Sequence, residues 1–149
     1  MQGSIVSINI SDKKGIRKKP VDEVRISENF GIDGDAHASS DWHRQVSLLA
    51  LESIQKMQAT GLKVKPGDFA ENITTLGIDL LCLPIGTKMQ IGSDVIGEVS
   101  QIGKVCHTRC AIYYQAGDCV MPKEGIFIKI LKGGSIKKGD KIVILNAKC

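Results

Sequence analysis

The sequence of 149 residues predicts one mainly β domain, folded as a closed barrel or a sandwich. Short apolar runs rich in β-branched residues recur along the chain, and glycine-containing turns separate them at regular spacing. The chain shows no internal repeat and no change of composition that would mark a domain boundary. Because its length suits one apolar core, we expect residues 1–149 to form a single domain.

The first half of the chain contains three predicted strands and one predicted helix. Residues 5–10 form a β-branched run, residues 21–26 alternate weakly, and residues 46–49 form a short apolar run. Residues 51–57 carry apolar side chains at every third position, and Gly61 is suited to cap the C-terminus of a helix. This spacing predicts a helix of about three turns after the third strand.

The second half is expected to be β throughout. A Gly-Ser-Asp turn at residues 92–94 joins two short runs, which predicts a hairpin, and Gly97 predicts a bend or bulge inside its second strand. A further glycine-rich turn is expected at residues 133–135. The runs expected to be extended are residues 69–75, 80–83, 88–91, 95–102, 126–130 and 141–145.

Composition and charge exclude several classes of function. The net charge of +4 is modest, and much of the local excess lies in a basic cluster at residues 13–19. With only three Phe, two Tyr and one Trp to stack on bases, no nucleic-acid partner is expected. No apolar run is long enough to cross a membrane, and the first residues lack the layout of a signal peptide. We expect a cytoplasmic protein with no membrane partner.

The stretch with the most reactive chemistry is residues 103–112. Lys104, His107 and Arg109 lie within six positions of Cys110, and nearby cationic side chains favour the thiolate form of a cysteine. A thiolate attacks electrophiles, accepts sulfur and binds soft metals. The alternative is that Cys106 and Cys110 are small apolar residues packed under a loop.

The number and spacing of the cysteines indicate neither a disulfide framework nor a structural zinc site. Five cysteines are an odd number without paired spacing, which predicts free thiols or ligands. Cys106, Cys110 and Cys119 form a C-x3-C-x8-C pattern that lacks the second compact pair of a zinc site. Dinucleotide, P-loop, zinc-protease and serine-hydrolase motifs are also missing. A Cys–His nucleophile pair stays open, with His107 or with a histidine that the fold brings near.

Two polar groups in the first half are candidate binding residues. Asp35 and His37 would share one face of an extended segment, where the carboxylate can orient the imidazole. His43 and Arg44 precede the strand at residues 46–49, and the guanidinium fork suits a phosphate or a carboxylate. The alternatives are a turn with a surface histidine for the first group, and pairing of the arginine with Asp41 or Glu52 for the second.

Two further polar residues are candidates of the same kind. Asn72 lies inside the predicted strand at residues 69–75, where it either faces solvent or offers a donor and an acceptor to a ligand. Lys123, in an irregular connection, adds a positive charge that suits an anionic group.

Several blocks of the sequence, in order, resemble the stand-alone MOSC domain family, named after the C-terminal domain of molybdenum cofactor sulfurases. The resemblance covers nearly the whole chain. It implies a single MOSC-type β-barrel, similar to the pyruvate-kinase barrel domain, with a few short helices. The blocks are residues 31–37, 42–49, 66–73, 83–86 and 103–110.

The resemblance also implies a function. Arg109-Cys110 resembles the Arg-Cys step that carries the sulfur-handling cysteine of the sulfurases and the molybdenum-ligating cysteine of amidoxime-reducing enzymes. Cys110 is therefore expected to carry a persulfide or to bind molybdenum, with His107 and Arg109 assisting. Arg44, His43, Arg109 and Lys123 are candidates for the phosphate of molybdenum cofactor (molybdopterin). Asp35, His37 and Asn72 are candidates for its pterin or for supporting contacts.

Expected partners are a cysteine desulfurase, enzymes of molybdenum cofactor synthesis, and a molybdoenzyme that accepts the cofactor. The chain lacks the aminotransferase-like domain of the sulfurases, so no pyridoxal phosphate is expected. Two other functions remain open at this stage. One is a stand-alone thiol enzyme acting on small electrophilic or N-hydroxylated compounds, and the other is a non-catalytic barrel that docks onto a cofactor-synthesis enzyme.

Overall fold

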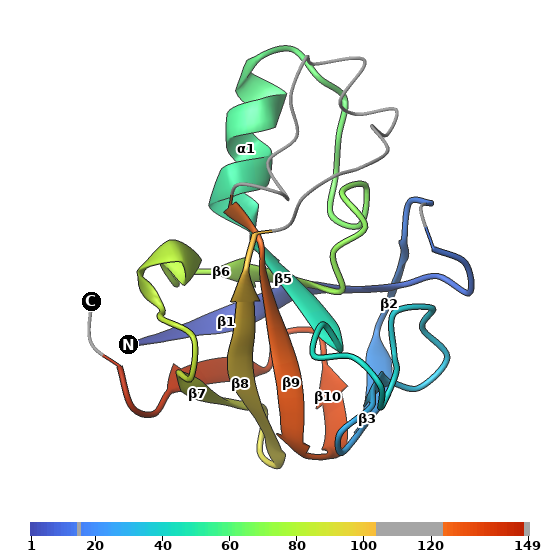
Figure 1. The fold of residues 1–149 in the computed structure, drawn as a ribbon. Coiled ribbons are helices and arrows are strands. Elements are labelled where there is room, and N and C mark those ends of the chain that lie inside the picture. Colours follow the sequence, from blue (N-terminus) through green and yellow to red (C-terminus); the bar gives the residue numbers. More distant parts are fainter. Residues whose placement is uncertain (15, 104–123, 148–149) are drawn as a thin grey trace.

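The computed structural model describes residues 1–14, 16–103 and 124–147 (Figure 1). Within these residues no helix is long and apolar enough to cross a membrane. The elements, in chain order, are β1 (Gln2–Ile10), β2 (Lys19–Val21), β3 (Glu23–Ser27), β4 (Gly31–Ile32), β5 (Val46–Ala50), α1 (Leu51–Ala59), β6 (Ile73–Leu76), the 3-10 helix η1 (Leu80–Cys82), β7 (Lys88–Ile91), β8 (Val95–Ile102), β9 (Ile126–Lys132), β10 (Gly134–Lys137) and β11 (Lys141–Ile144).

Seven of the described strands close into a barrel. Their order is β11-β7-β8-β9-β5-β6-β1, and pairing of β1 with β11 joins the two ends of the sheet. All neighbours are antiparallel except β5 and β6, which run parallel because α1 lies in the connection between them. β2 extends the sheet beyond β1, and its Pro20 is tolerated because no strand pairs on its far side. The prediction of a mainly β barrel is confirmed.

The barrel interior is filled by aliphatic side chains from every wall strand. In β5 the alternate residues Val46, Leu48 and Ala50 belong to the interior cluster. The residues between them face the other way, and Leu49 joins a second cluster with Phe127 of β9 and Met57 of α1. The amphipathic helix therefore covers the outside of β5 and β9, and Figure 1 shows it beyond one end of the barrel.

A second sheet of three strands, in the order β10-β3-β4, closes the side of the barrel where β3 meets β9. Residues 133–135 were expected to form a turn, but Gly134 and Ser135 pair with Ile26 and Arg25 as the start of β10. The backbones approach too closely for a side chain at the preceding position. A Cβ on Gly133 would lie 2.6 Å from the carbonyl oxygen of Ile26.

Two further predicted strands differ from the structure. Of residues 69–75 only the second half is extended, as β6, because the chain first makes a tight turn in which Ala70 adopts a φ of 62°. Residues 80–82 form the 3-10 helix η1 rather than a strand. Their apolar character is explained by burial, since Leu80 and Leu83 belong to the interior cluster.

β8 is irregular at two places, and the second matters for the site. The register against β9 shifts between Ile96 and Gly97, and again between Val99 and Gln101. The first shift confirms the bend predicted at Gly97, where a Cβ would lie 2.7 Å from Ile128 Cδ1. The second leaves Ser100 as an extra residue at the end of β8, next to the point where the strand leaves the barrel.

Candidate functional site

The candidate site is a rim cluster, defined as Trp42, His43, Arg44, Gln101 and Phe127. The first three residues immediately precede β5, Gln101 lies near the end of β8, and Phe127 lies near the start of β9. Because β8, β9 and β5 are neighbours in the sheet, these segments meet at one end of the barrel.

The backbone before β5 is fastened to β8 and β9 by the extra residue Ser100. Its hydroxyl donates to the carbonyl oxygen of His43 at 2.5 Å and lies 3.3 Å from that of Phe127. A bulge changes the direction in which a side chain points, and here it turns a strand residue toward a neighbouring loop. The bulge therefore fixes the position of the loop that carries His43 and Arg44.

His43 is connected to the base of the segment that begins after β8. Its ring Nε2 lies 2.7 Å from Gln101 Oε1, and the Gln101 amide donates to the carbonyl oxygen of Gly103 at 2.8 Å. Gly103 N–H in turn donates to Gly125 O at 2.7 Å. Residues 103 and 125 are therefore adjacent, and the chain leaves and re-enters the described structure at one place, beside the rim cluster (Figure 1).

Arg44 lies against two aromatic rings. Its Cζ is 4.6 Å from the centroid of Trp42 and 5.5 Å from the centroid of Phe127. The expected alternative, an ion pair with Asp41 or Glu52, does not form, and no other carboxylate of the described chain pairs with Arg44. Glu52 instead accepts from Gly77 N–H. The charge of Arg44 is thus available to an anionic group.

Asp35 is part of a buried ion pair rather than an open binding position. Its Oδ1 lies 2.7 Å from Lys18 Nζ, and both side chains are almost fully buried, at 1% and 0% exposure. Burial by itself would raise the pKa of Asp35. The hydrogen bond and charge of Lys18, with backbone N–H groups of Ser11 and His37, outweigh it and hold the pKa below its ordinary value.

His37 lies next to this pair, as the spacing of Asp35 and His37 predicted. Its Nδ1 is 3.7 Å from Asp35 Oδ2, and its side chain is 26% exposed. The backbone N–H of His37 donates to the same carboxylate oxygen at 3.0 Å. Asp35 is therefore positioned to orient the imidazole, and His37 remains a partly open candidate.

Asn72 is fully buried, and its amide is used within the protein. Its Oδ1 accepts from Ser47 N–H at 3.0 Å and from Ser47 Oγ at 3.2 Å, while its Nδ2 donates to Asn9 O at 3.2 Å. These bonds join β5 to β1 across β6. The described structure thus gives Asn72 a structural role and leaves none of its side chain exposed to a ligand.

Glu71, next to Asn72, is a buried carboxyl group with no ion-pair partner in the described part of the chain. Burial raises its pKa, although the N–H of Phe69 and the hydroxyl of Thr74 donate to it and act in the opposite direction. Thr74 Oγ1 also accepts from the Asn9 amide at 3.2 Å. Glu71, Asn72, Asn9, Thr74 and Ser47 form what we call the buried polar network.

The remaining predicted site residues, Cys106, His107, Arg109, Cys110 and Lys123, lie outside the described residues. Within the residues that are described, no three His, Cys, Asp or Glu side chains gather in a way that would hold a metal ion. Cys82, which was expected to be a free thiol, is disulfide-bonded, so that prediction is wrong for this residue.

Three residues that organise the site were not predicted from the sequence. Lys18 was taken as one member of a solvated basic cluster, and Gln101 and Phe127 as ordinary strand residues. Only the fold brings them to Asp35, His43 and Arg44. For Lys18 the sequence carried no local signal, because it stands between Arg17 and Lys19 in the basic cluster and its partner Asp35 lies 17 positions away.

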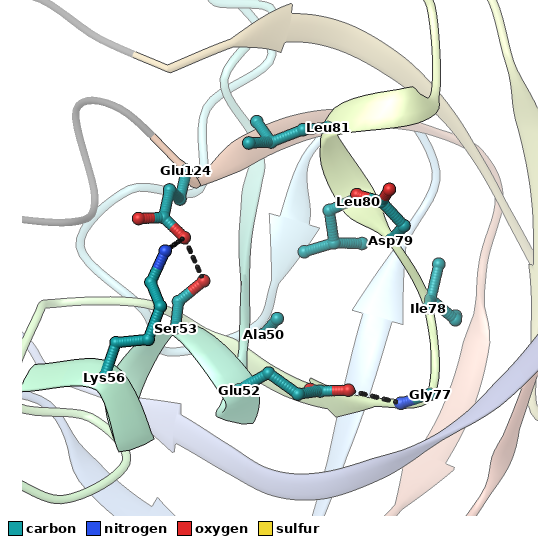
Figure 2. Close-up of a pocket in the computed structure, with 10 residues that line it drawn as sticks. All are labelled: Ala50, Glu52, Ser53, Lys56, Gly77, Ile78, Asp79, Leu80, Leu81 and Glu124. Carbon is teal, nitrogen blue, oxygen red and sulfur yellow. Dashed lines mark hydrogen bonds and ion pairs between the residues drawn. The ribbon is translucent and has the colours of Figure 1, made fainter. Parts of the chain in front are cut away.

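A pocket of about 440 Å³ lies beside the start of α1. Figure 2 shows Glu124 bound to Lys56 and Ser53 above it, and Glu52 bound to the N–H of Gly77 below. Three carboxylates against one lysine make it unfavourable for a phosphate-bearing ligand, so we do not include it in the candidate site. Its lining is Ala50, Glu52, Ser53, Lys56, Gly77, Ile78, Asp79, Leu80, Leu81 and Glu124.

Solved structures confirm the fold. YuaD of Bacillus subtilis superposes with a TM-score of 0.82 at 18% identity, covering 99% of this chain and 98% of that one. YiiM of Geobacillus stearothermophilus gives a TM-score of 0.72 at 23% identity over 97% of this chain and 75% of its own. YiiM of Escherichia coli gives 0.68 at 16% identity over 99% and 71%.

No curated protein sequence matches the chain. The family model described as MOSC domain matches residues 29–143, which include α1, the strands of the rim cluster and the barrel strands that follow β1. The resemblance read from the sequence blocks is thereby confirmed. This chain belongs to the MOSC domain family.

Proposed function

We propose that this protein binds molybdenum cofactor, or a precursor of it, and presents Cys110 to it as a persulfide carrier or as a ligand of the metal. MOSC domains are associated with molybdenum cofactor, and the chain belongs to that family. The observation that carries the proposal is the position of Arg44 and His43. They lie beside residues 103 and 125, which flank the stretch containing Cys110.

The described residues suit the phosphate end of such a cofactor. Arg44 has no carboxylate partner among them, and its guanidinium is held against two rings with its N–H donors directed along the plane of the group. His43 is exposed and lies next to it. Asn72 and Asp35 are buried and bonded within the protein, so they support the fold of the site rather than contact the cofactor.

When bound, the cofactor would supply a molybdenum centre able to accept a sulfur ligand. The chain would contribute a thiolate, and its neighbours His107 and Arg109 would favour that form. In the carrier version, the Cys110 thiolate attacks the outer sulfur of a donor persulfide. A new S–S bond then forms on Cys110, and the donor cysteine leaves as a thiolate. Cysteine desulfurases are the class of donor that this step requires.

The first experiment measures what the protein carries. The protein is purified anaerobically from a host that makes molybdenum cofactor, as wild type and as Cys110→Ala, with Cys106→Ala as the matched thiol control. We expect a molybdenum or pterin signal, or a mass increment of one sulfur atom, in the wild type and in Cys106→Ala but not in Cys110→Ala. An unmodified, cofactor-free protein in all three cases would contradict the proposal.

The second experiment separates the two versions. Incubation with a cysteine desulfurase and cysteine should add sulfur to Cys110 if the residue is a carrier, and unmodified Cys110 would remove that version. X-ray absorption of the loaded protein should lose a sulfur neighbour of molybdenum in Cys110→Ser if the residue is a ligand. An unchanged spectrum of Cys110→Ser with the cofactor still bound would rule out the version in which Cys110 is a metal ligand.

A further inference from the structure

Trp42 is the only tryptophan in the chain and is 47% exposed, although it is held in a defined position. Arg44 lies over its ring at 4.6 Å, and the His43 ring lies at 4.7 Å with a tilt of 35°. A single exposed apolar side chain is common at protein surfaces, so what distinguishes Trp42 is the cation beside its exposed ring. Its position beside an arginine without an acidic partner indicates a ligand that combines a ring with a negative charge.

Arg44 is prepared for an oxyanion by its surroundings. Its guanidinium carbon lies within cation–π distance of both Trp42 and Phe127, and packing against two rings limits where the group can move. The five N–H donors of the group lie in one plane, which suits the oxygens of a phosphate. The guanidinium donates no hydrogen bond to another side chain or carbonyl within the described ranges.

The loop that carries these groups is held rigidly. Ser100 fastens the carbonyl of His43 to β8 and β9, and Gln101 bonds the ring of His43. Phe127, which packs under Arg44, is 4% exposed and belongs to the cluster that includes α1. A ligand would therefore meet a site that is already ordered, which reduces the entropic cost of binding.

We infer that Trp42 and Arg44 form a binding site for aromatic phosphomonoesters, in which the guanidinium binds the phosphate and the indole stacks on the ring. The inference rests on the proposed function only for the natural ligand, since molybdopterin joins a pterin ring system to a phosphomonoester. The site itself is tested with simple compounds and does not require Cys110.

The test uses phenyl phosphate, inorganic phosphate and phenol as probes. Because Trp42 is the only tryptophan, its emission on excitation at long wavelength reports the site directly. ³¹P NMR line broadening measures the same affinities in variants without the tryptophan. We expect phenyl phosphate to bind about tenfold more tightly than inorganic phosphate, since stacking on an aromatic side chain commonly contributes that much, and phenol to bind more weakly than either.

Two substitutions separate the two contacts. Arg44→Gln should weaken phenyl phosphate at least about tenfold, because a charge-assisted fork is lost. Trp42→Leu should reduce the ratio of phenyl phosphate to inorganic phosphate affinity from about ten to about one. This ratio isolates stacking, because any loss of Arg44 orientation weakens both probes equally. Arg25→Gln is the matched control, since Arg25 is exposed on β3 and has no aromatic neighbour among the described residues.

The inference is overturned if the wild type binds the two phosphates equally, if Arg44→Gln binds like the wild type, or if Arg25→Gln loses as much affinity. Repeating the titration in Cys110→Ala distinguishes this result from the proposed function. Binding of phenyl phosphate by a protein that never carries pterin, molybdenum or sulfur would support the site and contradict the proposed function. A wild-type protein that carries sulfur or cofactor at Cys110 but does not bind phenyl phosphate would support the proposed function and contradict the inferred site.

Discussion

Polar residues in two regions of this barrel suggest ligand contacts, but the structure uses them differently. The side chains of the buried polar network and of the Lys18–Asp35 pair are buried and hydrogen-bonded to other groups of the protein. In the rim cluster, Arg44 pairs with no carboxylate of the described residues, and Trp42 is half exposed. A polar residue is therefore a candidate contact only when the fold leaves its donors or acceptors open, and residue type alone does not show this.

The largest expected effect concerns the Lys18–Asp35 pair. Lys18→Ala leaves the buried carboxylate of Asp35 without its cation, so we expect a loss of about 3–5 kcal/mol in the free energy of unfolding. Urea denaturation followed by circular dichroism measures it. The double variant Lys18→Met/Asp35→Asn removes both charges but keeps a side-chain oxygen as acceptor for a backbone N–H, so it should recover part of the loss. A loss below about 1 kcal/mol in Lys18→Ala would show that the pair is not structural.

The next effect concerns Asn72. Asn72→Ala leaves the N–H of Ser47 without a buried acceptor, which should lower the free energy of unfolding by about 2–3 kcal/mol. Ser47→Ala keeps that N–H bonded to Asn72 and serves as the milder control. If Asn72→Ala left stability unchanged but abolished retention of cofactor, Asn72 would belong with the rim cluster and the comparison would fail.

The two buried carboxyl groups should respond to pH in opposite directions. The pKa of Glu71 is raised by burial, so its contribution to stability is present at low pH and is lost as pH rises above 4.5 and through the folded-state pKa. Although burial acts to raise the pKa of Asp35, Lys18 lowers it overall, so its contribution is present above 3.8 and is lost as pH falls through the folded-state pKa.

Urea denaturation between pH 3 and 8 tests this difference. In Glu71→Gln the decrease in stability above pH 4.5 should become smaller, while the loss of stability in acid remains. In Asp35→Asn the loss of stability in acid should become smaller instead. Identical pH profiles for the wild type and Glu71→Gln would show that Glu71 ionises at its ordinary pH in the folded protein.

The sequence predicted the strands of the fold better than it predicted the contacts of the site. Short apolar runs separated by glycine-containing turns predicted β5, β7 and β8, and a glycine inside a strand predicted the bend at Gly97, because these features depend on neighbours in the chain. Residues 69–72 were predicted to be extended, and their turn at Ala70 was missed because a positive φ at alanine has no sequence signature.

The site was less predictable for a physical reason. His43 and Arg44 were identified from residue type, but their partners in the fold are distant in the chain. Gln101, which bonds His43, lies 58 positions after it, and Phe127 contacts Arg44 from the start of β9. Burial of Asn72 likewise depends on Asn9 and on Ser47 of another strand. Long-range pairing of strands decides both outcomes, and no local pattern contains it.

The smallest expected effect on stability concerns Arg44 and completes the comparison. Arg44→Gln removes a partly exposed cation that has no ion-pair partner in the described chain, so the free energy of unfolding should change by no more than about 0.5 kcal/mol. The emission of Trp42 should nevertheless shift, because the guanidinium leaves its ring. Denaturation followed by circular dichroism, which does not depend on Trp42, measures the first quantity, and steady-state fluorescence measures the second. A residue that serves a ligand should be dispensable to the fold when the ligand is absent. A loss above about 2 kcal/mol in the free energy of unfolding of Arg44→Gln would therefore show that Arg44, like Lys18, stabilises the fold.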